Sequence, residues 1–171
     1  TYTLMDNIVG YVPYDSSALI IEKDDIIIDG SGYTVEGADS GTGISLGGRS
    51  NVTIKDVTVK RFYYGIRLFE SSNNNSVYGN TITANDEYGI YLSTSSNNSV
   101  YGNNVSANNP YGIYLDDSPN NKIHGNTITN NGYGIWLDRS SNNVFSGNVF
   151  VNDGLVVSGP FRNVVVDNTV N

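Results

Sequence analysis

The chain of 171 residues contains no cysteine, which excludes disulfide bridges, zinc–thiolate sites and a thiol nucleophile. Histidine is nearly absent too, with one residue, and a lone histidine has no second histidine with which to build a metal or catalytic site. No segment reaches the roughly 18 consecutive apolar residues that a membrane-spanning helix needs. We therefore expect no membrane insertion and no resident cofactor, with Ca²⁺ as the one candidate ion.

Basic residues are in deficit, since 9 lysines and arginines face 17 aspartates and glutamates, and the net charge is −8. Such a surface repels phosphate backbones, so nucleic acid is not an expected partner. It also disfavours polyanionic sugars unless a divalent cation bridges the charges. The chain opens on the strand-like Thr1-Tyr2-Thr3-Leu4 without a signal peptide. We expect a mature extracellular, periplasmic or cell-surface protein from which a signal has been removed.

What the sequence does contain is an internal repeat. The motif Gly-Ile-x-Leu occurs five times, and subtraction of its glycine positions 43, 65, 89, 112 and 134 gives spacings of 22, 24, 23 and 22 residues. A degenerate sixth copy, Gly154-Leu155-Val156-Val157, follows 20 residues later. A fixed period of this length is typical of a solenoid.

Each repeat carries three short strand signals, as at 89–92, 99–101 and 104–106. Apolar and polar positions alternate in each of them, so one face of each strand should be buried. We predict an all-β fold, a single-stranded right-handed parallel β-helix of about seven coils of about 22–24 residues. It should form a single domain over 1–171, with an irregular first coil at 1–35 and regular repeats at 36–171. The main alternative is a leucine-rich repeat, which requires a Leu-x-x-Leu-x-Leu-x-x-Asn core that these repeats lack.

Asparagine recurs at two positions of the repeat. The first set precedes an inward apolar residue by two positions and should point inward, where stacked amides can satisfy buried polar groups; it comprises Asn80, Asn103, Asn126, Asn148 and Asn168. The second set lies in a turn, where asparagine tolerates left-handed backbone; it comprises Asn51, Asn74, Asn97, Asn120 and Asn142.

Aromatic residues form outward columns. Tyr91, Tyr114 and Trp136 occupy the x position of successive Gly-Ile-x-Leu motifs. Rings in such a column could bind the C–H faces of sugars, or could stabilise the sheet as cross-strand pairs. A further tyrosine column precedes each Gly-Ile and is expected at the corner of the coil in a structural role; it comprises Tyr64, Tyr88, Tyr111 and Tyr133.

Carboxylates follow two of the motifs. Asp116 and Asp138 are equivalent positions one coil apart, and Asp117 adjoins the first. Paired carboxylates are used by glycosidases and bind Ca²⁺, so Asp116, Asp138 and Asp117 are candidate catalytic residues and the first two a candidate calcium site. The competing interpretation is that these aspartates only accept hydrogen bonds from turn N–H groups.

Four Asn-x-Ser/Thr sequons start at Asn51, Asn74, Asn97 and Asn104. They are candidate glycosylation sites, although a chain rich in asparagine, serine and threonine also produces sequons by chance.

The repeat resembles a known family. The segments Asn-Asn-Ser-Val-Tyr-Gly-Asn at 74–80 and 97–103 and Gly-Tyr-Gly-Ile-Trp-Leu at 132–137 resemble the pectate-lyase-like superfamily, closest to the carbohydrate-binding and sugar-hydrolase (CASH) domains of NosD-like proteins. The resemblance implies the β-helix but no particular chemistry. The basic cluster at Lys55, Lys60, Arg61 and Arg67 lies two or three coils from Asp116 and Asp138, so the resemblance carries over no catalytic residues.

We therefore expect a non-catalytic secreted or cell-surface module that serves as a structural or assembly scaffold and contacts glycan through Tyr91, Tyr114 and Trp136. The alternative is a polysaccharide lyase or glycoside hydrolase using Asp116 and Asp138. The last segment, 163–171, still follows the repeat pattern, so the C-terminal end should be uncapped. It would then continue into a longer chain or associate end to end with a second copy.

Overall fold

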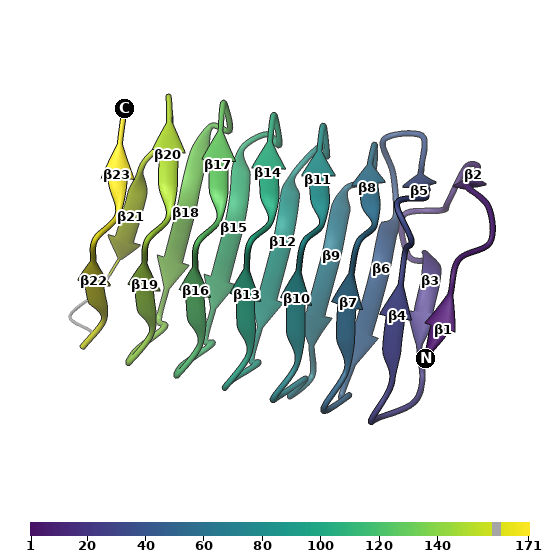
Figure 1. Ribbon diagram of the computed structural model, residues 1–171, viewed down its shortest axis with the longest axis horizontal. Coiled ribbons are helices and arrows are strands. Elements are labelled where there is room, and N and C mark those ends of the chain that lie inside the picture. The colour runs from purple at the N-terminus through teal and green to yellow at the C-terminus, as the bar shows by residue number, and fades with distance from the viewer. Residues whose placement is uncertain (159–161) are drawn as a thin grey trace.

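The computed structural model describes residues 1–158 and 162–171. Within them the chain winds as a solenoid, with three parallel sheets running along its length (Figure 1). The described residues include no helix, and hence no helix long and apolar enough to cross a membrane. The predicted all-β parallel solenoid of about seven coils is confirmed.

Each coil contributes one strand to each sheet. Sheet A consists of β1 (Tyr2–Thr3), β4 (Ile27–Asp29), β7 (Thr53–Lys55), β10 (Ser76–Tyr78), β13 (Ser99–Tyr101), β16 (Lys122–His124), β19 (Val144–Ser146) and β22 (Val164–Val166). Sheet B consists of β2 (Ile8–Val9), β5 (Thr34–Glu36), β8 (Thr58–Lys60), β11 (Thr81–Thr83), β14 (Asn104–Ser106), β17 (Thr127–Thr129), β20 (Val149–Val151) and β23 (Thr169–Val170). Sheet C consists of β3 (Ser17–Ile21), β6 (Thr42–Gly47), β9 (Tyr64–Phe69), β12 (Tyr88–Ser93), β15 (Tyr111–Asp116), β18 (Tyr133–Asp138) and β21 (Leu155–Ser158).

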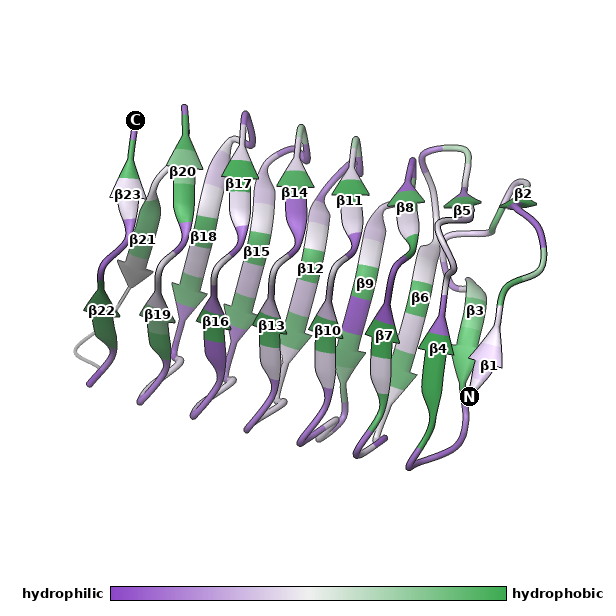
Figure 2. Ribbon diagram, viewed as in Figure 1, coloured by the Kyte–Doolittle hydropathy of each residue, from purple (hydrophilic) through white to green (hydrophobic). Residues whose placement is uncertain are grey.

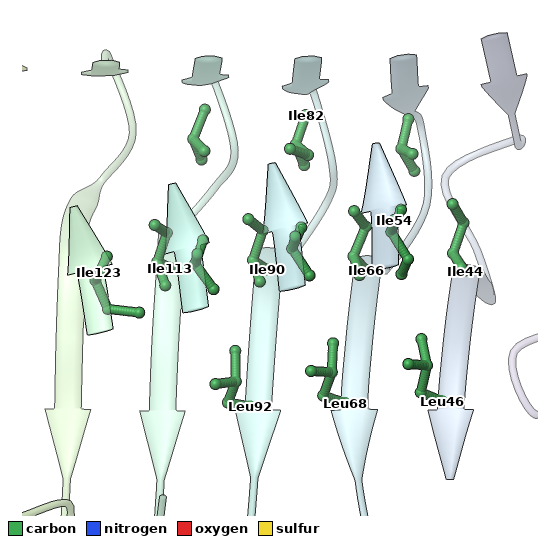
Figure 3. Packing of buried hydrophobic residues seen from close by; sticks show 14 of the residues in the cluster. Ile44, Leu46, Ile54, Ile66, Leu68, Ile82, Ile90, Leu92, Ile113 and Ile123 are labelled. Atoms are coloured by element: carbon green, nitrogen blue, oxygen red, sulfur yellow. The ribbon is translucent and has the colours of Figure 1, made fainter. Parts of the chain in front are cut away.

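The core is a stack of apolar side chains in register. Val77 pairs with Ile54 on one side and Val100 on the other, and all three are fully buried. Figure 2 shows hydrophobic positions recurring at the same place on successive strands, and Figure 3 shows the isoleucine and leucine columns pointing into the interior. Parallel strands lie about 4.8 Å apart, so each coil packs its apolar side chains directly on those of the next.

Buried asparagines line the turns, as predicted for the column that contains Asn103. Its Oδ1 accepts from Asn80 N at 3.0 Å, and its Nδ2 donates to Val77 O at 2.9 Å and to Asn126 Oδ1 at 3.0 Å. Two further buried columns behave in the same way and escaped the sequence analysis; they contain Asn75, Asn98, Asn121 and Asn143, and Asn85, Asn108 and Asn131. Asparagine side chains thus satisfy buried backbone groups that no strand partner reaches.

The second predicted asparagine set adopts the expected backbone. Asn51, Asn74 and Asn97 have φ of 57°, 60° and 58°, the left-handed conformation that asparagine tolerates better than most residues. These residues let the chain turn sharply between sheet C and sheet A.

The last two strands of the chain expose apolar side chains. Val165 and Val170 continue the core columns, yet 54% and 66% of their surface is exposed. The reason is their position, since β22 and β23 are the last strands of their sheets and are covered on one side only.

Candidate functional site

The predicted aromatic column lies on the outer face of sheet C. Tyr91 in β12 pairs with Tyr114 in β15, and Tyr114 pairs with Trp136 in β18. The three side chains are partly buried, because each leans on its neighbours along the sheet. Their shared register is therefore as predicted.

The second tyrosine column, expected at a corner of the coil, provides the first residue of each of four sheet C strands, and its rings contact those of the first column. Ring centroids lie 4.8 Å apart for Tyr88 and Tyr91, and 4.9 Å apart for Tyr111 and Tyr114. The two columns form one surface, here called the aromatic face, made of Tyr64, Tyr88, Tyr91, Tyr111, Tyr114, Tyr133 and Trp136.

A break in strand alternation explains this placement. Gly89 and Ile90 are both buried although they are consecutive, so Tyr88 and Tyr91 both face outward despite being three residues apart. Strict alternation would have placed Tyr88 with Ile90 on the inner side. Glycine is needed there, because a Cβ on Gly89 would lie 2.5 Å from Gly112 O.

Ring orientation decides which aromatics could receive a ligand. Tyr91 lies nearly parallel to Tyr64 and Tyr88, with interplanar angles of 24° and 26°. The Tyr64 and Tyr88 rings lie only 5.0 Å from each other, so both contact Tyr91 from the same side. Tyr114 is tilted 54° from Tyr111, and Trp136 stands at 70° to Tyr133. Among the described residues no ring stacks parallel on either Tyr114 or Trp136. Tyr114 and Trp136 are thus the two members of the predicted set without a parallel neighbour, and glycan binding by Tyr91, Tyr114 and Trp136 stays a prediction.

Carboxylates border Tyr114 and Trp136, here called the platform. Asp116 and Asp138 end β15 and β18 and are register partners, as predicted. Arg139 bonds three carboxylates at once, through Nη2 to Asp116 Oδ1 at 2.5 Å, Nε to Asp117 Oδ1 at 3.1 Å and Nη1 to Asp138 Oδ2 at 2.7 Å. The four residues are called the Asp–Arg cluster. The role of Arg139 was not predicted from the sequence, although its position one coil after Asp117 indicates that the two could pair.

The cluster contacts the aromatic face directly, because Tyr91 Oη donates to Asp116 Oδ2 at 3.4 Å. Burial raises the pKa of Asp116, the Arg139 charge opposes this rise, and Asp117 and Asp138 add to it. Burial also raises the pKa of Tyr114 to about 12. At neutral pH the Tyr114 phenol therefore remains protonated and can donate a hydrogen bond.

Arg139 occupies the space in which a cation shared by Asp116 and Asp138 would sit. Within 1–158 and 162–171 no group of three or more histidine, aspartate or glutamate side chains is arranged to hold a metal ion. The Asp–Arg cluster is thus an ion-pair network, and calcium binding by Asp116 and Asp138 stays a prediction.

The other candidate residues lie away from this site. Asn51, Asn74, Asn97 and Asn104 are exposed, so their side chains are accessible, and glycosylation stays a prediction. On sheet A, Tyr78, Tyr101 and His124 stack almost parallel, with centroids 4.8 and 4.9 Å apart. Their ring faces cover one another, which favours a structural role.

Two cavities also lie elsewhere. One of about 290 Å³ is lined by residues of β1, β3 and β4 in the first coils. The other, of about 540 Å³, lies at the corner of sheets A and B beside Lys55 and Asp56. Neither borders the platform formed by Tyr114 and Trp136.

Comparison with known proteins identifies a family and a fold. The family model described as "Periplasmic copper-binding protein (NosD)" matches residues 2–170, whereas no curated protein gives a significant match. Solved structures with the same fold include the periplasmic alginate epimerase AlgG (21% identity, TM-score 0.72, covering 96% of this chain and 51% of that one). An alginate lyase from Paenibacillus sp. str. FPU-7 is also similar (16% identity, TM-score 0.77, covering 96% and 69%). So is the A-module of the mannuronan C-5 epimerase AlgE4 of Azotobacter vinelandii (12% identity, TM-score 0.70, covering 96% and 55%).

The chain spans about half the length of the epimerase AlgG. Identities of this size show a shared fold alone, and about half of AlgG lies outside the part that this chain matches. The comparison with solved structures therefore supports the fold, and any activity or ligand has to be argued from the residues of this chain.

The residues present do not fit a copper site. Copper is held in proteins by histidine, cysteine and methionine, and this chain has no cysteine, one histidine and one methionine. His124 lies in β16 and stacks on Tyr101 at 2°, while Met5 follows β1 in the first coil. The two belong to distant coils and cannot ligate one ion. Even so, the family model extends over nearly the whole sequence, and the chain belongs to the NosD family within the pectate-lyase-like parallel β-helix superfamily.

Proposed function

We propose that this chain is a non-catalytic β-helix module that binds neutral glycan on the outer face of sheet C, through Tyr114 and Trp136. The observation that carries the proposal is the ring geometry, because these two aromatics have ring faces that no parallel ring covers. Sugars present flat C–H faces to such rings. Tyr91 lies beside Tyr114 on the next strand and is stacked against Tyr64 and Tyr88, so we assign it a supporting role.

The Asp–Arg cluster supplies polar groups beside the platform. Carboxylate oxygens accept and guanidinium nitrogens donate, so the cluster offers both kinds of partner to sugar hydroxyls. Arg139 fixes the orientations of Asp116 and Asp138 through the ion pairs described above. Three carboxylates against one guanidinium leave this end of the site acidic, which favours an uncharged sugar there.

The same cluster argues against catalysis. Asp116 and Asp138 share one arginine, whereas a glycosidase needs a free acid and a free base or nucleophile on opposite sides of the bond. One observation favours the alternative of a lyase or hydrolase: burial raises the pKa of Asp116, as is common for a general acid.

A periplasmic or extracellular location is part of the proposal. It is supported by the family, whose description is periplasmic, and by the fold shared with a periplasmic epimerase. Glycans of the cell surface are then within reach of the module.

Affinity electrophoresis in gels containing neutral polysaccharides tests the binding. Wild-type protein should be retarded by at least one polymer, and Trp136→Ala and Tyr114→Ala should lose that retardation. Tyr78→Ala, which removes a ring from the sheet A stack, is the matched control and should migrate like the wild type. Equal retardation of all four proteins, or of none of them across the panel, would reject the platform.

Catalysis is tested separately by the release of reducing ends or unsaturated products, with and without Ca²⁺. We expect none. Product formation that disappears in Asp116→Asn or Asp138→Asn would establish the enzyme instead.

A further inference from the structure

Arg67 occupies the position that precedes Tyr91, Tyr114 and Trp136 in the outward column of sheet C. It is the register partner of Tyr91 on one side and of Ser45 on the other, so it lies on the same face as the platform. Its guanidinium carbon lies 4.9 Å from the ring centre of Tyr64 and 4.4 Å from that of Phe69. Cation–π contacts with two rings of its own strand fix the guanidinium in place.

Arg67 has no acidic partner in the part of the chain that the structure describes. Other basic residues of the same region do, since Lys55, Lys60 and Arg61 each form ion pairs. Moreover, Nε of Arg67 is buried without a hydrogen-bond partner. A buried donor left unpaired destabilises the fold, and a partly desolvated charge interacts more strongly with an opposite charge than an exposed one does.

These observations describe a guanidinium that is held by its surroundings and lacks an anion. We propose that Arg67 binds the carboxylate of an acidic sugar unit, within a glycan whose neutral units stack on Tyr114 and Trp136. Because Nε is buried while the residue as a whole is partly exposed, the carboxylate would contact the two terminal nitrogens, whose planar arrangement matches its two oxygens. This inference rests on the proposed function, because Arg67 lies two strands, roughly 10 Å, from Tyr114 along the same face.

Charge elsewhere on the molecule restricts the ligand further. The Asp–Arg cluster lies at the other end of the site, and the whole chain carries a net charge of −8. A polymer with a carboxylate on every unit would be repelled there. The ligand is therefore a mainly neutral glycan with sparse uronate groups.

Glucuronoxylan and its carboxyl-reduced form provide a matched pair of probes, because they differ only in the uronate groups. Isothermal titration of wild-type protein should show about tenfold tighter binding of the acidic form at low ionic strength, and the difference should shrink in salt. Arg67→Gln should bind both forms with the affinity that the wild type shows for the reduced one. Arg67→Lys, which keeps the charge but loses the fork, should retain only part of the preference.

A second measurement does not depend on the choice of polymer. The Nε–Hε resonance of Arg67 in ¹⁵N spectra should shift saturably with sodium glucuronate and not with methyl glucoside. Absence of that shift, or a preference for acidic glucuronoxylan that persists in Arg67→Gln, overturns the inference. Failure of the proposed function looks different, since Trp136→Ala would then bind both polymers as the wild type does.

Discussion

Among single residues, Asp153 occupies a position that suits asparagine better. It follows Asn85, Asn108 and Asn131 in one buried column. Asn131 Nδ2 donates to Asp153 Oδ2 at 2.9 Å, while Asp153 Oδ1 is buried without a hydrogen-bond partner. At the equivalent atom, Asn108 and Asn131 carry an Nδ2 that donates to a backbone carbonyl.

Asp153→Asn should therefore stabilise the protein by about 1 kcal/mol at neutral pH, because it restores a donor and removes a partly buried charge. Burial raises the pKa of Asp153, and hydrogen bonds from Asn131 only partly offset the rise. Since the folded-state pKa lies above the unfolded value, protonation stabilises the fold at low pH, and this stabilisation is lost as pH rises through the folded-state pKa.

The advantage of Asp153→Asn should consequently be largest at neutral pH and shrink towards pH 4, near the unfolded pKa of about 3.9. Urea unfolding at several pH values measures it, with the exposed Asp86→Asn as control. An advantage that is constant with pH would contradict this account of Asp153.

At the scale of secondary-structure elements, the asparagine column that contains Asn103 stabilises the turns between sheets A and B. Asn103→Ala removes an acceptor for Asn80 N and donors to Val77 O and Asn126 Oδ1. Several buried groups are then left unpaired, so the free energy of unfolding should fall by about 3 kcal/mol.

The neighbouring Asn104 is exposed on β14, and Asn104→Ala should change the free energy of unfolding by less than about 0.5 kcal/mol. Urea denaturation compares the two variants. Similar losses in both would mean that the buried column does not stabilise the turns.

The strand ends of β15 and β18 give a second prediction. Arg139 neutralises Asp116, Asp117 and Asp138, and its removal would leave three adjacent carboxylates, the ligand type that Ca²⁺ prefers. Arg139→Gln should gain a calcium-dependent rise in unfolding temperature, whereas the wild type should show none. Thermal unfolding with Ca²⁺ or chelator measures this, and a wild-type rise equal to that of Arg139→Gln would show that the ion pairs do not compete with the cation.

The strands were predictable because their pattern is simple. The strands predicted at 99–101 and 104–106 coincide with β13 and β14, because the alternation of apolar and polar residues and the repeat indicate the same strand boundaries. The site was predictable only in part. Alternation placed Tyr91, Tyr114 and Trp136 outward, but the break at Gly89 and the tilt of each ring depend on packing between coils, which one repeat does not encode.

At the scale of the whole molecule, the repeat determined the fold through its period, and the family match agrees with it. The family description did not determine the chemistry, because the sequence has no cysteine and only one histidine and one methionine to bind copper. The excess of acidic residues could be read from the sequence alone. The ion pairs of Arg139 could not, because Asp116 and Arg139 are 23 positions apart and only the fold brings them together.

The strands β22 and β23 present an open sheet edge with exposed apolar side chains. Val164, Val165 and Val166 are 50%, 54% and 42% exposed, and open edges pair with other strands. Isolated residues 1–171 should therefore associate with rising concentration in sedimentation velocity. Val165→Lys should reduce this association, whereas Val151→Lys on the outer side of β20 should not. A strict monomer at all concentrations would reject end-to-end pairing for this chain.

Glycan binding at Tyr114 and Trp136 is the central claim, and the single tryptophan of the chain gives it a direct probe. Trp136 fluorescence should change saturably when wild-type protein is titrated with a neutral polysaccharide that retards it in gels. In Tyr114→Ala the dissociation constant should rise at least about tenfold, which corresponds to about 1.4 kcal/mol, and in Tyr101→Ala it should be unchanged. A Trp136 signal that never saturates with any neutral polysaccharide, or that is the same in Tyr114→Ala as in the wild type, would contradict the claim.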